Sequence, residues 1–150
     1  MKKMERKENA NKGFSLVELI VVVAIMAVLV GILAPQYLKY VEKTRVQKDE
    51  SAAEEIRHAV EISMADENIY KGLKWDTTSN KITVTVLDGS DTYTVATEDG
   101  TALATELKNV VGKVDFTSKV HNGQQYVVTV TNTSGDVKVK GEFETPTTTH

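Results

Sequence analysis

An uncharged apolar run near the N-terminus most constrains how this chain can fold. No charged residue occurs from Leu19 to Leu38, within the longer stretch KGFSLVELIVVVAIMAVLVGILAP that spans residues 12–35. A helix from Phe14 to Ala34 would be about 31 Å long at ~1.5 Å per residue, which matches a hydrocarbon core of about 30 Å. We therefore interpret residues 14–38 as a membrane-spanning helix.

Basic residues gather before this run. Residues 1–13 hold five of the 18 Lys and Arg residues and two of the 21 Asp and Glu residues, so the positive-inside rule predicts a cytoplasmic leader and an outward-facing remainder after Lys39. That remainder holds 13 basic against 19 acidic residues, which gives it no attraction for nucleic acid or anionic lipid. The chain has no Cys, so an exported domain must fold without disulfides.

Two simpler interpretations of the N-terminus stay open. A secretory signal peptide would have an apolar region of only about 7 to 15 residues. The best small-residue exit, Ala34, has Ile32 two positions before it instead of another small residue, and Pro35 directly after it. A plain single-span anchor fits the length. It gives no reason for Glu18, because a carboxylate costs about 2.5 to 3.5 kcal/mol at the centre of a span.

The stretch KGFSLVEL, followed by the apolar run and Pro35, resembles the N-terminal signature of type IV pilins and their relatives. The resemblance covers the leader and the first helix. In that family a prepilin peptidase cuts after the glycine on the cytoplasmic face and methylates the new N-terminal residue. The resemblance therefore implies removal of residues 1–13 by cleavage between Gly13 and Phe14, and N-methylation of Phe14. The apolar helix would stay as a membrane anchor and then form the core of a helical filament.

Glu18 has two possible partners. The resemblance implies that it meets the cationic amine of Phe14 in a neighbouring subunit during assembly, which would offset the penalty for burying either charge alone. Alternatively, Glu18 lies one turn from its own amine and favours the positive end of its own helix dipole.

Gly31 and Pro35 predict a weak turn in the helix. Pro35 has no N–H to donate to the carbonyl of Gly31, so one helical hydrogen bond is lost, and the proline also disfavours α geometry at Ala34. Glycine at position 31 weakens the helix by a further ~1 kcal/mol. One interpretation is a simple bend, which membrane helices tolerate. The other, implied by the resemblance, is a helix break that unwinds when subunits leave the membrane and pack.

Residues 39–71 predict an amphipathic helix that ends between Glu67 and Lys71. Apolar and small residues recur at three- and four-residue spacing, with charged residues opposite them, so this half should pack on a head domain. The apolar stripe comprises Ala52, Ala53, Ile56, Ala59, Val60, Ser63 and Met64, and the charged face comprises Glu50, Glu54, Arg57 and Glu61.

Residues 72–150 predict a β-sheet head with a loose C-terminal tail. Alternating apolar and polar residues, separated by Asp-Gly and Ser-Gly turns, predict two hairpins, and an apolar face that stops at Gly112 predicts a short helix between them. The expected strands are residues 81–87, 92–97, 125–131 and 137–143, and the expected helix is 101–112. The fold class is therefore α+β, with a long N-terminal helix packed on a small antiparallel sheet.

The sequence contains only weak indications of a metal site. Glu55 and His58 have the E-x-x-H spacing of di-iron carboxylate bundles, but a second such pair is missing, so a solvated helix face is the preferred interpretation. Asp88, Ser90 and Asp91 lack the spacing and the distal Glu of a calcium loop, so we interpret them as a turn. We expect no metal and no cofactor.

Catalytic chemistry is not signalled either. His121 lies in an expected turn without an identifiable nucleophile, so we expect it to be solvated. Asn132 begins an N-x-S/T sequon that is easily accidental in a Thr-rich loop. We expect that the protein is not an enzyme.

Three functions of different classes remain. The preferred one is a bacterial type IV pilin, a cell-surface fimbrial subunit whose partners are further copies of itself, a prepilin peptidase, the pilus assembly platform with its ATPase, and the membrane. The second is a pseudopilin of a type II secretion or DNA-uptake machine. The third is a membrane-tethered extracellular binding domain that never polymerises.

Overall fold

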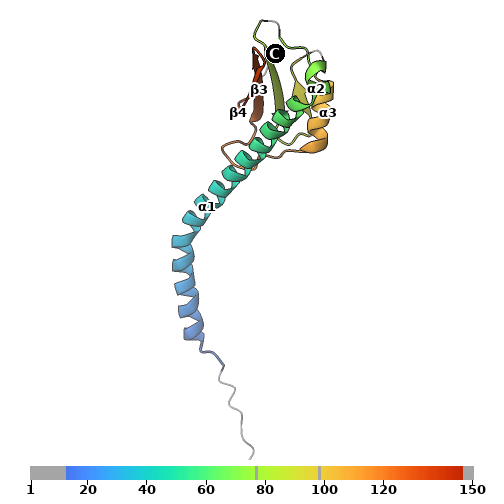
Figure 1. Cartoon of the computed structure of the whole chain (residues 1–150). Helices are drawn as coiled ribbons and strands as arrows, with labels where there is room; N and C mark the ends of the chain where they lie inside the picture. Colours follow the sequence, from blue (N-terminus) through green and yellow to red (C-terminus); the bar gives the residue numbers. More distant parts are fainter. Residues whose placement is uncertain (1–12, 77, 98, 147–150) are drawn as a thin grey trace, which may run out of the picture. The chain divides into compact units, whose positions relative to one another are not determined.

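The computed structural model describes residues 13–76, 78–97 and 99–146. These residues divide into two compact units, with the boundary after Tyr40. The elements follow the order α1, α2, β1, β2, α3, β3, β4 (Figure 1). The predicted α+β fold is confirmed. Residues 1–12 of the predicted leader and residues 147–150 of the predicted tail lie outside the described residues.

Helix α1 spans Leu16–Ala65 and is not interrupted at Gly31 or Pro35. The predicted helix break is therefore not seen, and Ala34 also has helical geometry. A proline removes only one hydrogen bond, and the i to i−4 bonds on both sides of it keep the helix continuous. A weak turn at Gly31 and Pro35, and its unwinding during assembly, stay predictions.

Residues 39–71, predicted as one amphipathic helix, belong to two helices. Helix α1 stops at Ala65, and α2 spans Glu67–Gly72. Asp66 has an extended backbone, and its side chain accepts a hydrogen bond from the N–H of Asn68 at 2.8 Å. Aspartate is a preferred N-cap residue, so Asp66 starts a new helix instead of continuing the old one.

Four antiparallel strands form the sheet of the head, in the order β2-β1-β3-β4. Strand β1 (Lys81–Leu87) pairs with β2 (Tyr93–Val95) and with β3 (Gln125–Thr133), and β3 pairs with β4 (Asp136–Glu144). Both predicted hairpins are confirmed. The second hairpin turns at Ser134 and Gly135, whose φ angles of 56° and 91° suit a two-residue turn.

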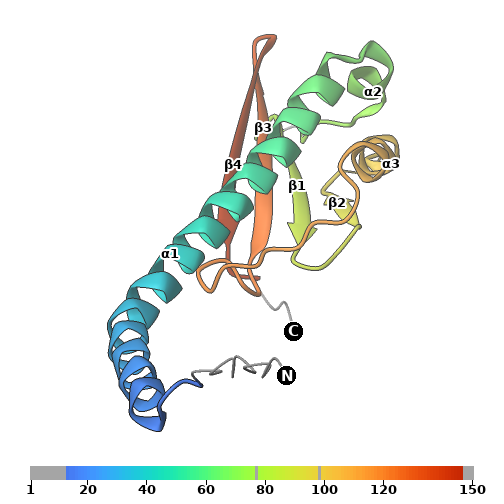
Figure 2. The same cartoon turned by 90° about the horizontal axis from the view of Figure 1, so that it is seen from below.

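The hydrophobic core lies between α1 and one face of the sheet. Figure 2 shows the head half of α1 lying across β3 and β4, with α3 (Thr101–Val110) beside β2. The predicted stripe of α1 supplies Ile56 and Val60, both fully buried, and α3 supplies Leu103 and Leu107. The facing side chains of the sheet are Ile82, Val84, Val86, Tyr126, Val128 and Val130.

Candidate functional site

The predicted cleavage junction lies outside regular secondary structure. Gly13, Phe14 and Ser15 precede the first helical residue, Leu16, and 90% of the Phe14 side chain is exposed. An ideal Cβ at Gly13 would meet no neighbouring atom within 4 Å. Exposed, non-helical backbone is where proteolysis concentrates in general, and cleavage at this junction stays a prediction.

Glu18 has a partner within its own chain. Its Oε2 atom accepts a hydrogen bond from the N–H of Ser15 at 2.9 Å, and the Oγ atom of Ser15 accepts one from the N–H of Val17 at 3.3 Å. This arrangement is a variant of the capping box: the glutamate three residues after the N-cap serine accepts from the serine N–H, and the serine hydroxyl accepts from the second helical N–H instead of the third. The sequence interpretation missed Ser15, although the pattern S-x-x-E before an apolar run indicates such a cap.

The apolar part of α1 presents its side chains to its surroundings on all sides. From Leu16 to Leu38, every large apolar side chain is between 50% and 74% exposed. An 18-residue window of this helix reaches a mean hydropathy of 3.1, so by length and composition the helix can cross a membrane. A surface this apolar requires lipid or protein around it.

A buried carboxylate that the sequence did not indicate lies in the head half of α1. Asp49 is fully buried. Its Oδ1 atom accepts hydrogen bonds from the N–H of Thr117 at 2.8 Å and from the hydroxyl of Thr117 at 3.4 Å. Its Oδ2 atom accepts one from the N–H of Ser118 at 2.8 Å. Burial raises the pKa of Asp49, but the hydrogen bonds from Ser118 and Thr117 together with nearby His121 outweigh it, so the pKa is lower than its ordinary value. Asp49 therefore binds the loop as a carboxylate.

The prediction of a solvated His121 is wrong. The residue is only 8% exposed, and its ring stacks on that of Phe143 with the ring centroids 3.8 Å apart. The backbone N–H of His121 donates to the hydroxyl of Ser118 at 3.1 Å, and the ring atom Nδ1 lies 3.5 Å from the Asp49 Oδ2 atom. The turn that contains His121 folds back onto the sheet, which is why a histidine in a loop is buried.

Ser118, His121 and Asp49 do not form a catalytic triad. The serine hydroxyl and the Asp49 carboxylate both approach the same ring nitrogen, Nδ1, at 3.3 and 3.5 Å, whereas a triad needs one partner on each nitrogen. The serine is also fully buried, so no substrate reaches it. The cluster holds the loop in place.

Two further carboxylates hold the same loop, residues 111–124 between α3 and β3. Glu42 accepts a hydrogen bond from the N–H of Lys119. Asp88, in the predicted Asp-Gly turn, accepts from the N–H of Phe116 at 2.7 Å and from that of Gly123 at 3.3 Å. The loop is therefore fixed by side-chain carboxylates and not by strand pairing alone.

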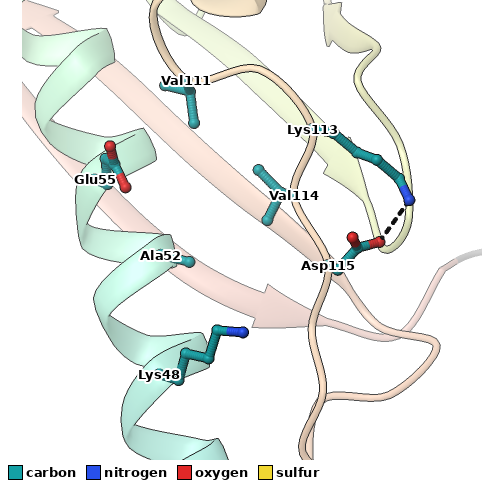
Figure 3. Close-up of a pocket in the computed structure, with 7 residues that line it drawn as sticks. All are labelled: Lys48, Ala52, Glu55, Val111, Lys113, Val114 and Asp115. Carbon is teal, nitrogen blue, oxygen red and sulfur yellow. Dashed lines mark ion pairs between the residues drawn. The ribbon is translucent and has the colours of Figure 1, made fainter.

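Between α1 and this loop lies a pocket of about 220 Å³ (Figure 3). Lys113 and Asp115 form an ion pair of 3.0 Å at its wall. The lining residues are Lys48, Ala52, Glu55, Val111, Lys113, Val114 and Asp115.

Glu55 lines this pocket, whereas the side chain of His58 is exposed and its Nδ1 atom lies 3.4 Å from Glu61, so the two residues of the E-x-x-H pattern are not brought together. Among the described residues no group of three or more possible metal ligands occurs.

The Asn132 side chain is engaged at both ends. Its amide nitrogen donates to the hydroxyl of Tyr70 at 2.7 Å, and its oxygen accepts from the N–H of Gly135 at 3.0 Å. These contacts close the second hairpin turn and bind it to α2. They give Asn132 a structural role that does not depend on glycosylation.

Comparisons with known proteins connect the N-terminal region to fimbrial proteins. Residues 9–34 match the model of the prokaryotic N-terminal methylation motif. The fimbrial protein of Pseudomonas aeruginosa is 32% identical over 108 residues, which cover 69% of this chain and 70% of that protein. Prepilin peptidase-dependent protein A of Clostridium perfringens is 42% identical over 67 residues, 43% of this chain and 46% of that protein.

The type IV major fimbrial protein FimA of Dichelobacter nodosus is 37% identical over 59 residues, 39% of this chain. The match spans only 38% of the length of that relative. No solved structure matches the chain.

Proposed function

This chain belongs to the type IV pilin family, and on that premise we propose that it is the structural subunit of a surface type IV pilus. The family is one of fimbrial proteins and not of enzymes. Membership implies processing by a prepilin peptidase and self-assembly into filaments. The steps below assign these events to residues of this chain.

The first step is processing. The basic leader stays in the cytoplasm, and a prepilin peptidase cuts between Gly13 and Phe14, which removes residues 1–13 and leaves Phe14 as the methylated N-terminus. Support comes from the non-helical, exposed junction, which requires no unfolding before cleavage. The capping box at Ser15 keeps the helix from extending into the junction.

The second step is transfer from membrane to filament. Residues 14–38 first anchor the precursor as a single span, with the head outside. In the filament, the same side chains pack against other subunits, so their exposed apolar surface is covered in both states. The assembly platform and its ATPase supply the work of extracting the helix from lipid, and the weak turn at Gly31 and Pro35 unwinds as subunits pack.

The third step sets the register of neighbouring subunits through charge. Glu18 pairs with the Phe14 amine of a neighbour, since an unpaired charge in an apolar filament core is heavily penalised. Oε2 already accepts from Ser15 within the chain, which orients the carboxylate. Oε1 has no hydrogen-bond partner among residues 13–76, 78–97 and 99–146, which leaves it for the neighbour. The local cap and the contact between subunits are therefore compatible.

The observation that carries this proposal is an accessible Gly13–Phe14 junction directly before an uncharged, exposed helix. We test it by expressing the full chain with and without a prepilin peptidase and its assembly machinery. Mass spectrometry should find methylated Phe14 at the N-terminus only with the peptidase, and electron microscopy should show surface filaments labelled by an antibody to the head. A mature chain beginning at Met1 or after Ala34 contradicts the proposal. Short periplasmic filaments that depend on secretion components would indicate the pseudopilin instead.

A further inference from the structure

Four large apolar side chains are exposed on the described part of the head. Ile62 is 72% exposed, Leu87 is 49%, Val110 is 60% and Val120 is 58%. None contributes to the core. Single exposed apolar residues are common on protein surfaces, so their arrangement decides whether they indicate a contact.

Two of these side chains share one groove. Ile62 on α1 and Val110 on α3 line a groove of about 130 Å³ together with Ile69 of α2. Ala59 and Ser63 also line it, and two acidic residues, Asp66 and Glu106, complete it. Because one water molecule takes about 30 Å³ of liquid, the groove has room for the three carbon atoms of a valine side chain. We call it the Ile62–Val110 groove.

Val120 stands on a rigid loop. The N–H of Lys119 donates to Glu42, and the ring of His121 is stacked on Phe143, so both neighbours of Val120 are fixed to the body of the head. The N–H of Asn122 donates to the carbonyl of Ser118 at 3.0 Å and closes the turn. An apolar side chain held this way loses little conformational entropy when it binds.

One molecule cannot place its own Val120 in its own groove. The loop is bonded to α1 at Glu42 and Asp49, and the groove lies at Ala59 to Asp66. At ~1.5 Å per helical residue, the loop contacts and the groove are about 15 to 36 Å apart along the helix. A second copy, shifted along the helix by that distance, brings the two surfaces together.

The charges beside the two surfaces are complementary. Lys119 precedes Val120, and its side chain is basic, whereas Asp66 and Glu106 at the groove are acidic. Docking Val120 into the groove therefore places the Lys119 cation beside the carboxylates of Asp66 and Glu106. This complementarity favours a second copy of this chain as the occupant.

We propose that Val120 of one subunit inserts into the Ile62–Val110 groove of the next subunit. The proposal rests on the proposed function and adds to it a contact between heads. The contact joins different surfaces on the two copies, so each subunit can both give and receive one, and the series remains open as a filament requires. The three carboxylates and the buried histidine that fix the loop serve to present Val120 rigidly.

The test uses disulfide formation in the full-length chain, which has no native Cys. Both Val110 and Val120 are exposed, so Val110→Cys and Val120→Cys should not disturb the fold. In cells with the assembly machinery, the double variant should give a ladder of dimers, trimers and longer species after mild oxidation on a non-reducing gel. Either single variant should stay monomeric, and so should Val120→Cys combined with Leu87→Cys.

Other results overturn the contact. A double variant that remains monomeric, or that stops at a dimer, excludes an open series through these residues. Electron microscopy of wild-type cells reports on the proposed function separately. Filaments without a ladder reject the contact and leave the pilus assignment standing, whereas a ladder in membranes without any filament supports the contact and rejects the pilus.

A charge exchange provides the second readout. Lys119→Glu and Glu106→Lys should each reduce the amount of sheared filament several-fold, because each places like charges at the contact. The combined variant should restore the wild-type amount. A purely local effect of Lys119→Glu on its own loop would not be rescued by a change at Glu106, so failure of the rescue overturns the proposed pairing.

Discussion

Asp49 and Ser118 are 69 positions apart in the sequence, yet the Asp49 Oδ2 atom accepts a hydrogen bond from the Ser118 N–H at 2.8 Å. The bond fixes α1 to the loop between α3 and β3. Since the carboxylate is fully buried, its other contacts, with Thr117 and His121, replace the water that it would bind in the unfolded chain.

The head should fold without the membrane helix. Residues 41–150 form a compact unit of their own that contains the core and all of its strands. We expect a fragment that starts at Tyr40 to be soluble and cooperative in denaturant unfolding, with the same midpoint in the presence and absence of a reducing agent. Aggregation of this fragment would show that the core needs residues from the N-terminal unit.

Asp49→Ala should destabilise this fragment by about 3 to 5 kcal/mol, because it leaves the buried N–H of Ser118 and the partly buried N–H of Thr117 without their acceptor and removes the carboxylate beside His121. Urea unfolding followed by circular dichroism measures the loss. Glu50→Ala, at the exposed neighbouring position, is the matched control and should change the free energy of unfolding by less than about 0.5 kcal/mol. Equal effects at the two positions would contradict the structural role of Asp49.

The acid dependence of stability has a defined sign. The pKa of Asp49 is lower in the folded chain than its ordinary value of about 3.9, so the folded state favours the carboxylate. Its ionisation contributes stability that is full above the unfolded pKa and is lost as the pH falls through the lower folded pKa. The fragment should therefore lose stability below about pH 4, and Asp49→Asn should show a shallower decline. Parallel urea titrations of both proteins test this, and identical slopes would exclude Asp49 as the source.

The apolar stripe of α1 is tested with two isoleucines of the same helix. Ile56 is fully buried, whereas Ile62 is 72% exposed. Ile56→Ala should lower the free energy of unfolding by about 2 to 5 kcal/mol through lost burial and a residual cavity. Ile62→Ala should stay within about 0.5 kcal/mol of wild type. A reversed order would mean that the helix packs through another face.

Residue patterns were sufficient to predict the hairpins and the packing face of α1. The strands were predicted from local signals, which are the alternation of apolar and polar residues in 81–87 and 125–131 and the turn residues between strands. In the structure Val84 pairs with Val128, so the apolar side chains of the two strands lie on the same face of the sheet. The Ser15–Glu18 cap also has a local pattern, S-x-x-E. These features depend on residues only a few positions apart.

Asp49 and His121 could not be placed by such patterns. Asp49 lies in the charged segment KDE, which is typical of a solvated helix face, and His121 lies in a polar turn. Their burial depends on backbone N–H groups supplied by a distant loop, and backbone donors leave no mark in the sequence. For the same reason the sequence did not indicate how firmly Val120 is held.

The last prediction concerns the charge of Glu18. Glu18→Gln keeps the shape of the side chain, and glutamine also serves at the third position of a capping box, so the start of α1 at Leu16 should be preserved. The variant should insert into the membrane and be cleaved at Gly13 at least in part, because a neutral amide enters lipid more readily than a carboxylate. It should yield few sheared filaments, since an ammonium without its carboxylate costs about 1 to 3 kcal/mol at each contact.

Repetition makes this a sensitive test, because every subunit of a homopolymer carries the same defect. A tethered binding domain would use Glu18 only at its own helix end, where the charge contributes about 0.3 to 1 kcal/mol and does not affect assembly. The measurement is the ratio of surface-sheared to membrane-retained protein in wild type and variant, with Ser15→Thr as a control that retains both the cap and the charge. Because that control changes the cap residue and leaves the carboxylate, its ratio should equal that of wild type. Equal ratios for Glu18→Gln and wild type, with abundant filaments in both, would exclude pairing of Glu18 with the amine of a neighbouring subunit.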